Sequence, residues 1–547
     1  MKTILSTIIV CLTGLSLFAC KDLDEMNISP NDIMPDVADP SLLISTVITK
    51  SGTLILSLGF GDIAGVMQHT QKDGWSGGHN AYEWNTSDWG GFYENLRNSK
   101  ELLRKANETG NDYYAGVAKL YMALNFGSIA DIWGDAPFSD ALQGKEGLKK
   151  PKFDSQKDIY LGVLAYLDEA NTLLSKRQSE YIVNSTQDVM YGGDVNKWRK
   201  FANSLALRYY LRISTKEPAI AEAGIKKILG DPDNYPLILN AADDAAFVYP
   251  GTNSDISWPC NTVYNADESN WRRLKMCSTL VELLRTLNDP RIAVWANKVS
   301  IPLFLDKSKP VDYDAIEDGV RVIGVNVEKE FLDNFEGTPL CYNPDYVGLP
   351  PSWNGAAYPY NLNPNLVQAP INPHVSHLND LYKKNTDPLL KARVLSAAEM
   401  HFSLAEIALK GWGGNAQEQY YAGIKASFET WGVSGDYNNY IASSGAIFKG
   451  TLEQIIEQKW IAAWTAATEA WFDYRRTGLP NLKPGKVVKQ NALPIRFYYG
   501  NNELNYNTEN VKEAIEKLEP TQFYMEEEGK NTAWAKSWLL QGTNKPW

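Results

Sequence analysis

The chain has 547 residues, of which 44% are hydrophobic and 22% charged, and it carries a net charge of −12 at pH 7. This length is sufficient for one large helical assembly or for two or three independent cores. The acidic balance argues against nucleic acid as a partner, because no excess of Lys and Arg is available to neutralise phosphates.

Residues 1–19 have the pattern of an export signal. Lys2 precedes an apolar stretch that is too short for a spanning helix, which needs ~20 apolar residues, and that ends abruptly in charge. The stretch Leu17-Phe18-Ala19-Cys20 resembles a bacterial lipobox, which implies cleavage before Cys20 and lipid on its thiol. The alternative is an ordinary secretory signal with an incidental cysteine.

Residues 20–38 follow the proposed lipid site and are expected to form a flexible tether, because the segment is charged and poor in apolar residues. The run Lys21-Asp22-Leu23-Asp24-Glu25 resembles the acidic tag of surface-exposed lipoproteins in the Bacteroidetes. We therefore expect a protein that is lipid-anchored at the cell outer membrane and faces outside.

Regularly spaced apolar residues predict helices along much of the remaining chain. The first ordered helix is expected to begin at Asp39-Pro40, an N-cap followed by proline at the first helical position, and to run through Leu58 as a core helix. Apolar residues at spacings of three and four predict further amphipathic helices over 113–124, 159–174 and 198–209.

Capping boxes define the C-terminal helices most clearly. Ser396 and Glu399 open one helix, which ends before Gly411, and Asn415 opens a second helix, which stops at Gly432. Two such helices with a short glycine turn predict an αα-hairpin, the unit of tetratricopeptide-like stacks. A third helix is expected to run from the capping box at 451–454 through Trp471 to a basic last turn, glycine and proline at 475–480.

Two long segments have another character. Residues 71–93 and 341–373 are rich in Gly, Pro, Asn and aromatic residues and show no helical period. Loops of this length are usually functional or disordered, and their aromatic content argues against disorder.

Ordered motifs along the chain resemble the SusD/RagB family, specifically its second SusD-like branch of nutrient-binding outer-membrane lipoproteins. The matching stretches are WGDAPFSDAL (133–142), KWRKFANSLALRYYLRIS (197–214), NDPR (288–291), EMHFSLAEIALKGW (399–412), QKWIAAWTAATEAWFDYRRTGLP (458–480) and PIRFYYGNNELNYN (494–507). The resemblance implies a mainly α fold in which tetratricopeptide-like hairpins scaffold a loop-rich binding half. Residues 39–547 are then expected to form a single domain.

The same resemblance implies a function. Members of this family are not enzymes; they cover a SusC-type TonB-dependent outer-membrane transporter and capture glycans, or in some members peptides, for import. We expect a glycan ligand and, through the lipid anchor, association with the outer membrane.

The two aromatic loops are the expected ligand site, because flat rings stack on the apolar faces of sugars while amides and carboxylates bind the hydroxyls. The candidates for stacking are Trp75, Trp84, Tyr346, Trp353 and Tyr358, and the candidates for hydrogen bonding are Asp73, Asn80, Asn343 and Asn354. The alternative is that these aromatic residues pack the loops onto the helices. Trp198, Trp460, Trp464 and Trp471 lie at helical spacing and are expected in the core.

No catalytic residue, metal site or cofactor is predicted. The sequence contains neither a Gly-x-Ser-x-Gly elbow nor a phosphate loop, and His374 and His377 lack the glutamate of a zincin motif. Two alternatives stay open: a secreted α-helical glycoside hydrolase, which needs only two carboxylates, and a structural scaffold without a ligand. Cys260, Cys277 and Cys341 are too few for a disulfide framework and leave open one pairing, Cys260 with Cys277.

Overall fold

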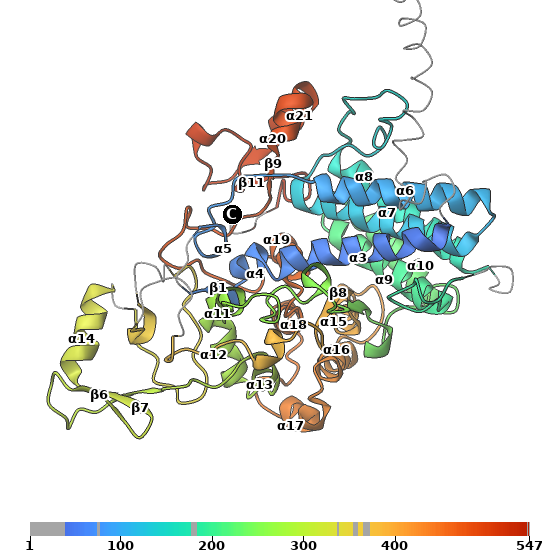
Figure 1. The fold of residues 1–547 in the computed structure, drawn as a ribbon. Helices are drawn as coiled ribbons and strands as arrows, with labels where there is room; N and C mark the ends of the chain where they lie inside the picture. Colours follow the sequence, from blue (N-terminus) through green and yellow to red (C-terminus); the bar gives the residue numbers. More distant parts are fainter. Residues whose placement is uncertain are drawn as a thin grey trace, which may run out of the picture.

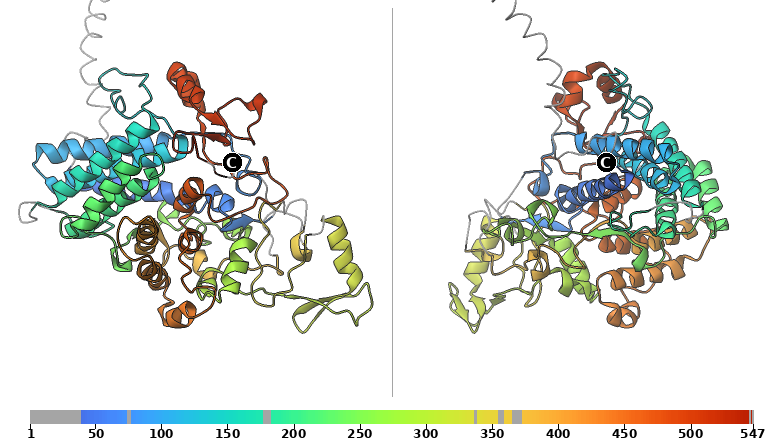
Figure 2. Two further views of the ribbon diagram at one scale, coloured as in Figure 1. Left: turned by 180° about the vertical axis from the view of Figure 1, so that it is seen from behind. Right: turned by 45° about the vertical axis from the view of Figure 1, so that its right-hand side comes forward.

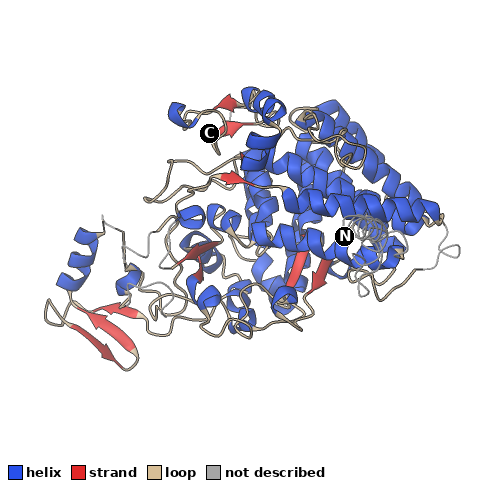
Figure 3. Ribbon diagram, turned by 45° about the horizontal axis from the view of Figure 1, so that its top comes forward, coloured by secondary structure: helices blue, strands red, loops and turns tan. Residues whose placement is uncertain are grey.

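The computed structural model describes residues 39–547 except 74–76, 177–182, 336–337, 354–358, 365–371, 544 and 546–547. Helices are the main regular structure of this part of the chain, and the strands are short and pair in sheets of two or three (Figures 1 and 3). The predicted mainly α fold is thereby confirmed. The predicted signal, the tether with Cys20, and the candidates Trp75, Asn354 and Tyr358 lie outside the described residues.

The helices follow one another along the whole described chain. They are α3 (Pro40–Gly59), α4 (Asp62–Val66), α5 (Gly77–Asn80), α6 (Gly90–Glu108), α7 (Asp112–Trp133), α8 (Gln156–Leu174), α9 (Val195–Ile213), α10 (Pro218–Gly230), α11 (Ser269–Arg273), α12 (Ser278–Thr286), α13 (Arg291–Trp295), α14 (Val325–Asn334), α15 (Ala397–Leu409), α16 (Ala416–Thr430), α17 (Tyr437–Ile441), α18 (Leu452–Ala462), α19 (Ala467–Thr477), α20 (Asn501–Tyr506) and α21 (Thr508–Glu516).

Most strand pairs join segments that are distant in sequence. The antiparallel pairs are β1 (Thr70–Lys72) with β4 (Leu274–Met276), β3 (Ala245–Val248) with β8 (Lys391–Leu395), and β10 (Glu519–Pro520) with β11 (Ala535–Lys536). β2 (Thr86–Ser87) pairs in parallel with β9 (Tyr498–Tyr499), and β5 (Leu303–Leu305), β7 (Val320–Ile323) and β6 (Asp314–Glu317) form a three-stranded sheet in that order.

Helix α3 begins where its sequence predicts. The Asp39 side chain accepts a hydrogen bond from the backbone N–H of Ser41 at 2.7 Å, and Pro40 occupies the first turn. By length and composition the stretch Pro40–Val66 could cross a membrane, and it is the one such stretch among the described residues. Ile44, Val47 and Ile48 are nevertheless fully buried, and α3 packs against α6 and α7. The prediction of a core helix is confirmed.

The predicted helices at 113–124, 159–174 and 198–209 correspond to α7, α8 and α9. Helices α6 to α10 pack in sequential pairs, and α15 packs on α16 and α18 (Figure 1). In the predicted C-terminal hairpin Ser396 caps α15 by accepting from Glu399 N, and Asn415 caps α16 by accepting from the N–H groups of Gln417 and Glu418. The four tryptophans expected in the core are all buried there.

The third C-terminal helix differs from the prediction. It is broken between α18 and α19, and Thr465 adopts a left-handed backbone conformation with φ of 68°. The break allows Lys459 of α18 to reach Asp473 of α19, with 2.8 Å between the amine and the carboxylate. In one continuous helix these residues would be roughly 21 Å apart along the axis, at 1.5 Å per residue. The break thus brings together a buried ion pair that the apolar period does not encode.

A smaller apolar cluster lies apart from the main core. It contains Leu303 of β5, Ile323 of β7, Phe331 of α14 and the predicted ligand residue Trp353. The sheet and α14 extend away from the helical stack, at the end opposite to helices α6 to α8 (Figures 1 and 2). The second aromatic loop contributes Trp353 to this cluster, and at Leu349 its N–H donates to Met276 O and its carbonyl accepts from Ser278 N.

The disulfide between Cys260 and Cys277 that the sequence left open is not present. Both side chains are buried free thiols. The Cys260 sulfur accepts a hydrogen bond from Trp258 Nε1 at 3.1 Å, and the Cys277 thiol lies 3.6 Å from Thr279 Oγ1. Burial raises the pKa of each thiol to about 12, so both stay protonated at neutral pH.

Candidate functional site

The two aromatic loops meet through direct hydrogen bonds. The Asn80 side chain accepts from Lys72 N at 2.9 Å and donates to the backbone oxygens of Lys72 and Trp353, each at 2.8 Å. Gln71 Oε1 accepts from Ser352 N at 3.0 Å. Asn80 is only 1% exposed, so its amide holds the first loop to the second. These bonds give Asn80, a predicted ligand residue, a structural role at the junction, and it does not belong to the lining of the adjacent pocket.

A pocket of about 420 Å³ opens beside this junction, and we call it the inter-loop pocket. Its lining residues are Ala81 and Glu83 of the first loop, Trp353 of the second, Asn334 and Phe335 at the end of α14, and Lys486, Val487, Val488 and Lys489. Its volume falls within the 300–1,000 Å³ that is usual for small-molecule sites.

The segment with Lys486 to Lys489 is fixed against both loops. Lys489 N donates to Ala81 O at 2.8 Å, and Val487 N donates to Ser352 O at 3.3 Å. The side-chain amine of Lys489 pairs with Glu528 at 2.7 Å, which places one charged pair at the pocket. Backbone bonds to each loop make this segment a third wall of the site.

Aromatic rings form the apolar wall. Trp353 is 6% exposed, and its ring lies 5.5 Å from that of Tyr360 and 6.4 Å from that of Phe335, measured between centroids. Phe335 is half-buried and therefore keeps part of its ring accessible. Both are edge contacts, and Phe335 and Trp353 together form the apolar part of the pocket lining.

Trp84 belongs to the core. It is 7% exposed, and its ring makes edge contacts with Phe497 at 4.6 Å and with Trp471 at 5.5 Å. Its Nε1 donates to Gly78 O at 3.1 Å. The alternative in which an aromatic residue packs the loop onto the helices describes Trp84, which is buried in this structure.

The other described candidates lie outside the lining of the inter-loop pocket. Asn343 Oδ1 accepts from the N–H groups of Asp345 and Tyr346 at 3.0 and 2.8 Å, which makes it a turn-forming residue. The half-buried Tyr346 packs against the main core. Asp73 is buried at the end of β1, where its N–H donates to Arg273 O. Of the predicted site residues that the structure describes, Trp353 alone lines the pocket.

Sequence reasoning missed Phe335 and the segment 486–489. Phe331 and Phe335 are four residues apart, a spacing that signals the apolar face of a helix and could have located α14. Residues 486–489 carry no aromatic side chain and no periodic pattern, so their part in the site depends on contacts with residues more than a hundred positions away.

The histidine pair takes structural positions. His374 Nδ1 contacts Ile301 O at 2.7 Å, and the His377 ring stacks on Trp271 with 5.0 Å between centroids. Burial lowers the pKa of His377 to about 2, so this ring stays neutral. In the described part of the chain no three His, Cys, Asp or Glu side chains gather as a set of metal ligands.

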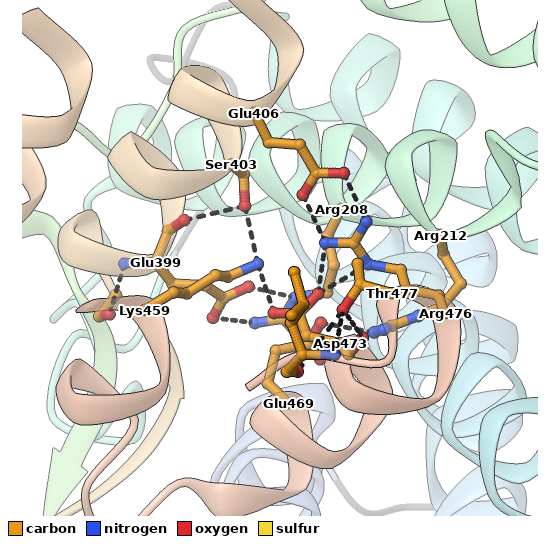
Figure 4. A network of polar contacts seen from close by, with 12 residues as sticks. Arg208, Arg212, Glu399, Ser403, Glu406, Lys459, Glu469, Asp473, Arg476 and Thr477 are labelled. Atoms are coloured by element: carbon orange, nitrogen blue, oxygen red, sulfur yellow. Dashed lines mark hydrogen bonds and ion pairs between the residues drawn. The ribbon is translucent and has the colours of Figure 1, made fainter. Parts of the chain in front are cut away.

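A cluster of buried charges lies between α9, α15, α18 and α19 (Figure 4). Clusters of this kind often mark active sites. Its bonds include Arg208 with Glu399 at 2.7 Å, Arg212 with Glu469 at 2.5 Å, Arg476 with Glu406 at 2.6 Å, and Lys459 with Asp473 at 2.8 Å. Although burial opposes the shift, Arg476 and Lys459 hold the pKa of Asp473 below its usual range.

The space within this charge cluster is only about 50 Å³. That volume is close to that of one or two water molecules and is too small for a sugar ring. Each carboxylate named above is bound by a cation at 2.5 to 2.8 Å, so none is placed as an accessible acid or base for a glycoside. The cluster joins four helices.

Comparisons with known proteins extend over nearly the whole chain. A sequence model of the SusD-like family, described as starch-binding and associating with the outer membrane, matches residues 32–330 and 352–500. No curated protein matches significantly.

Several solved structures share the fold. A putative outer-membrane protein from Bacteroides vulgatus, described as probably involved in nutrient binding, is 22% identical with a TM-score of 0.70; the match covers 92% of this chain and all of the other. A SusD homolog from Bacteroides fragilis is 20% identical with a TM-score of 0.70 and the same coverage. A chitin-binding SusD homolog from Flavobacterium johnsoniae is 22% identical with a TM-score of 0.66, covering 91% of this chain and 99% of its own.

Proposed function

Because this chain belongs to the SusD-like family, whose description is starch-binding and outer-membrane association, we propose that it binds a nutrient oligosaccharide in the inter-loop pocket. One observation carries the proposal: the pocket forms where the two aromatic-rich loops meet, with Phe335 and Trp353 as its apolar wall. Glu83, Asn334 and Lys486 supply polar groups around that wall. Sugars need this combination, since their rings have apolar faces and polar rims.

Binding without turnover is the expected result for the soluble chain lacking residues 1–20. Starch and chitin oligosaccharides are the first ligands to titrate, because the family description names starch and one structural relative is described as chitin-binding. Calorimetry measures binding, and an assay for new reducing ends measures hydrolysis. Released reducing ends would favour the glycoside hydrolase alternative. Binding of peptides with no response to any glycan would favour a peptide-binding member of the family.

We also propose that lipid on Cys20 anchors the protein on the outer face of the outer membrane, where it delivers its ligand to a SusC-type TonB-dependent transporter. The export pattern of residues 1–19 and the outer-membrane association of the family support this location. The full chain is expected to co-purify with a β-barrel transporter from detergent-solubilised outer membranes, and Cys20→Ser is expected to release it from the membrane fraction. Purification without any such barrel would contradict the partnership.

A further inference from the structure

A second, larger cleft of about 770 Å³ lies on the helical stack. It is bounded by the first half of α6, by the connection between α7 and α8, and by α20, and it shares no lining residue with the inter-loop pocket. In Figure 1 the α7–α8 connection is the loop on the same side of the stack as α20 and α21. We call this space the α6 cleft.

Two aromatic residues line the α6 cleft and are held in place by hydrogen bonds. Tyr93 donates its hydroxyl proton to Pro137 O at 2.6 Å, and Trp89 Nε1 donates to Glu503 Oε1 at 3.3 Å. Their rings make an edge contact with centroids 5.5 Å apart. The cleft therefore has a fixed apolar wall beside polar side chains such as Asn98.

The carboxylates of the cleft already have partners. Glu101 binds Arg104, and Glu146 lies 3.8 Å from the Lys100 amine. Asp88 accepts hydrogen bonds from Gly90 N and from the Asn502 side chain. Glu503 accepts from Trp89 and from Asn507.

Two of the four cationic side chains that line the cleft form no ion pair with a carboxylate of the described residues. Arg97 and Lys145 are exposed, and neither forms an ion pair with a carboxylate of the described residues. Beyond Lys145 the same connection carries Lys149, Lys150 and Lys152, which are exposed and equally without such an ion pair. Residues 145–152 thus carry four lysines and one glutamate in a chain with a net charge of −12, and of these lysines Lys145 lines the cleft.

We propose that the α6 cleft is a second ligand site, which takes an anionic oligosaccharide whose rings carry carboxylates or sulfate esters. Arg97 and Lys145 bind the acidic groups, and the half-buried Tyr93, which makes an edge contact with the buried Trp89, offers the ring against which a sugar packs. Charge-assisted bonds from an exposed guanidinium and ammonium suit carboxylate and sulfate oxygens. A cleft lined by polar side chains can admit a chain of sugar rings. An anionic bilayer also presents acidic groups, but its flat surface would contact only the rim of the cleft.

The test compares an oligogalacturonate with a neutral starch oligosaccharide of equal length, titrated against the soluble chain. The anionic ligand is expected to bind the double variant Arg97→Gln/Lys145→Gln about tenfold or more weakly than the unchanged chain, since a hydrogen bond to a charged group contributes ~1.5–3 kcal/mol. Raising the salt concentration is also expected to weaken binding of the anionic ligand to the unchanged chain. The neutral ligand is expected to bind both proteins equally.

The double variant Lys226→Gln/Lys425→Gln is the matched control, because it removes two exposed cations from α10 and α16. This control is expected to leave binding of the anionic ligand unchanged. Trp353→Ala in the inter-loop pocket is expected to leave it unchanged as well. An equal loss in the lysine control would show non-specific attraction and overturn the site. Absence of oligogalacturonate binding, or binding only to vesicles of anionic phospholipid, would overturn it too. Trp353→Ala tests the inter-loop pocket and the Arg97/Lys145 variant tests the α6 cleft. Failure of one proposal can therefore be distinguished from failure of the other.

Discussion

Replacing Arg212 by methionine is expected to lower the free energy of unfolding by about 3–5 kcal/mol, because it leaves buried acids without their cation. The Arg212 side chain is 1% exposed, with Nη2 at 2.5 Å from Glu469 and Nε at 3.1 Å from Asp131. Burial raises the pKa of Asp131, and Arg212 with Arg475 opposes that shift. Urea denaturation followed by circular dichroism measures the change.

Lys226→Met is the control for this stability measurement. Lys226 pairs with Glu222 on the surface of α10, and both side chains are well exposed. Exposed pairs contribute little, because water screens them and the side chains lose freedom when they pair. Its unfolding midpoint is expected to match that of the unchanged chain. A midpoint for Arg212→Met that is equally unchanged would show that the charge cluster does not stabilise the junction of the four helices.

Phe335→Ala is expected to weaken oligosaccharide binding by roughly tenfold to thirtyfold, which corresponds to about 1.4–2 kcal/mol. Phe335 is half-buried at the end of α14, so its ring can contact a ligand and its loss should leave the fold intact. Trp353→Ala is expected to weaken binding at least as much, because Trp353 supports the same wall. Calorimetric titration of both variants with the oligosaccharide that binds the unchanged chain measures the effect.

Two controls accompany these binding variants. Trp412→Ala removes a half-buried tryptophan from the turn after α15, outside the lining of the inter-loop pocket, and is expected to bind normally. Thermal unfolding checks the fold, since Trp353 belongs to an apolar cluster and truncating a buried tryptophan costs ~3–5 kcal/mol. Normal binding by both Phe335→Ala and Trp353→Ala, each still folded, would exclude this wall from ligand recognition.

Helix starts and ends could be predicted from the sequence because their signals are local. Asp39, Ser396 and Asn415 each cap a helix within three residues of their own position, and each does so in the structure. The break between α18 and α19 was not predicted. It places Lys459 and Asp473 in contact, although the apolar period joins their two elements into one.

The site was predicted less completely for the same reason. The sequence identified the loops that meet, but it could not rank the rings within them: Trp84 lies in the core and Trp353 lines the pocket, although both stand in aromatic-rich segments. Asn80 resembles a ligand residue by type, and its partners are backbone atoms of Lys72 and Trp353. Contacts between segments distant in sequence decide whether a polar side chain bonds to the backbone or remains available to a ligand.

The location of a bound oligosaccharide in a crystal of the complex tests the central claim most directly. We predict electron density for a sugar ring in the inter-loop pocket, in contact with Phe335 and within hydrogen-bonding distance of Glu83, Asn334 or Lys486. A neutral starch or chitin oligosaccharide seated elsewhere on the molecule, with this pocket holding only water, would contradict the account.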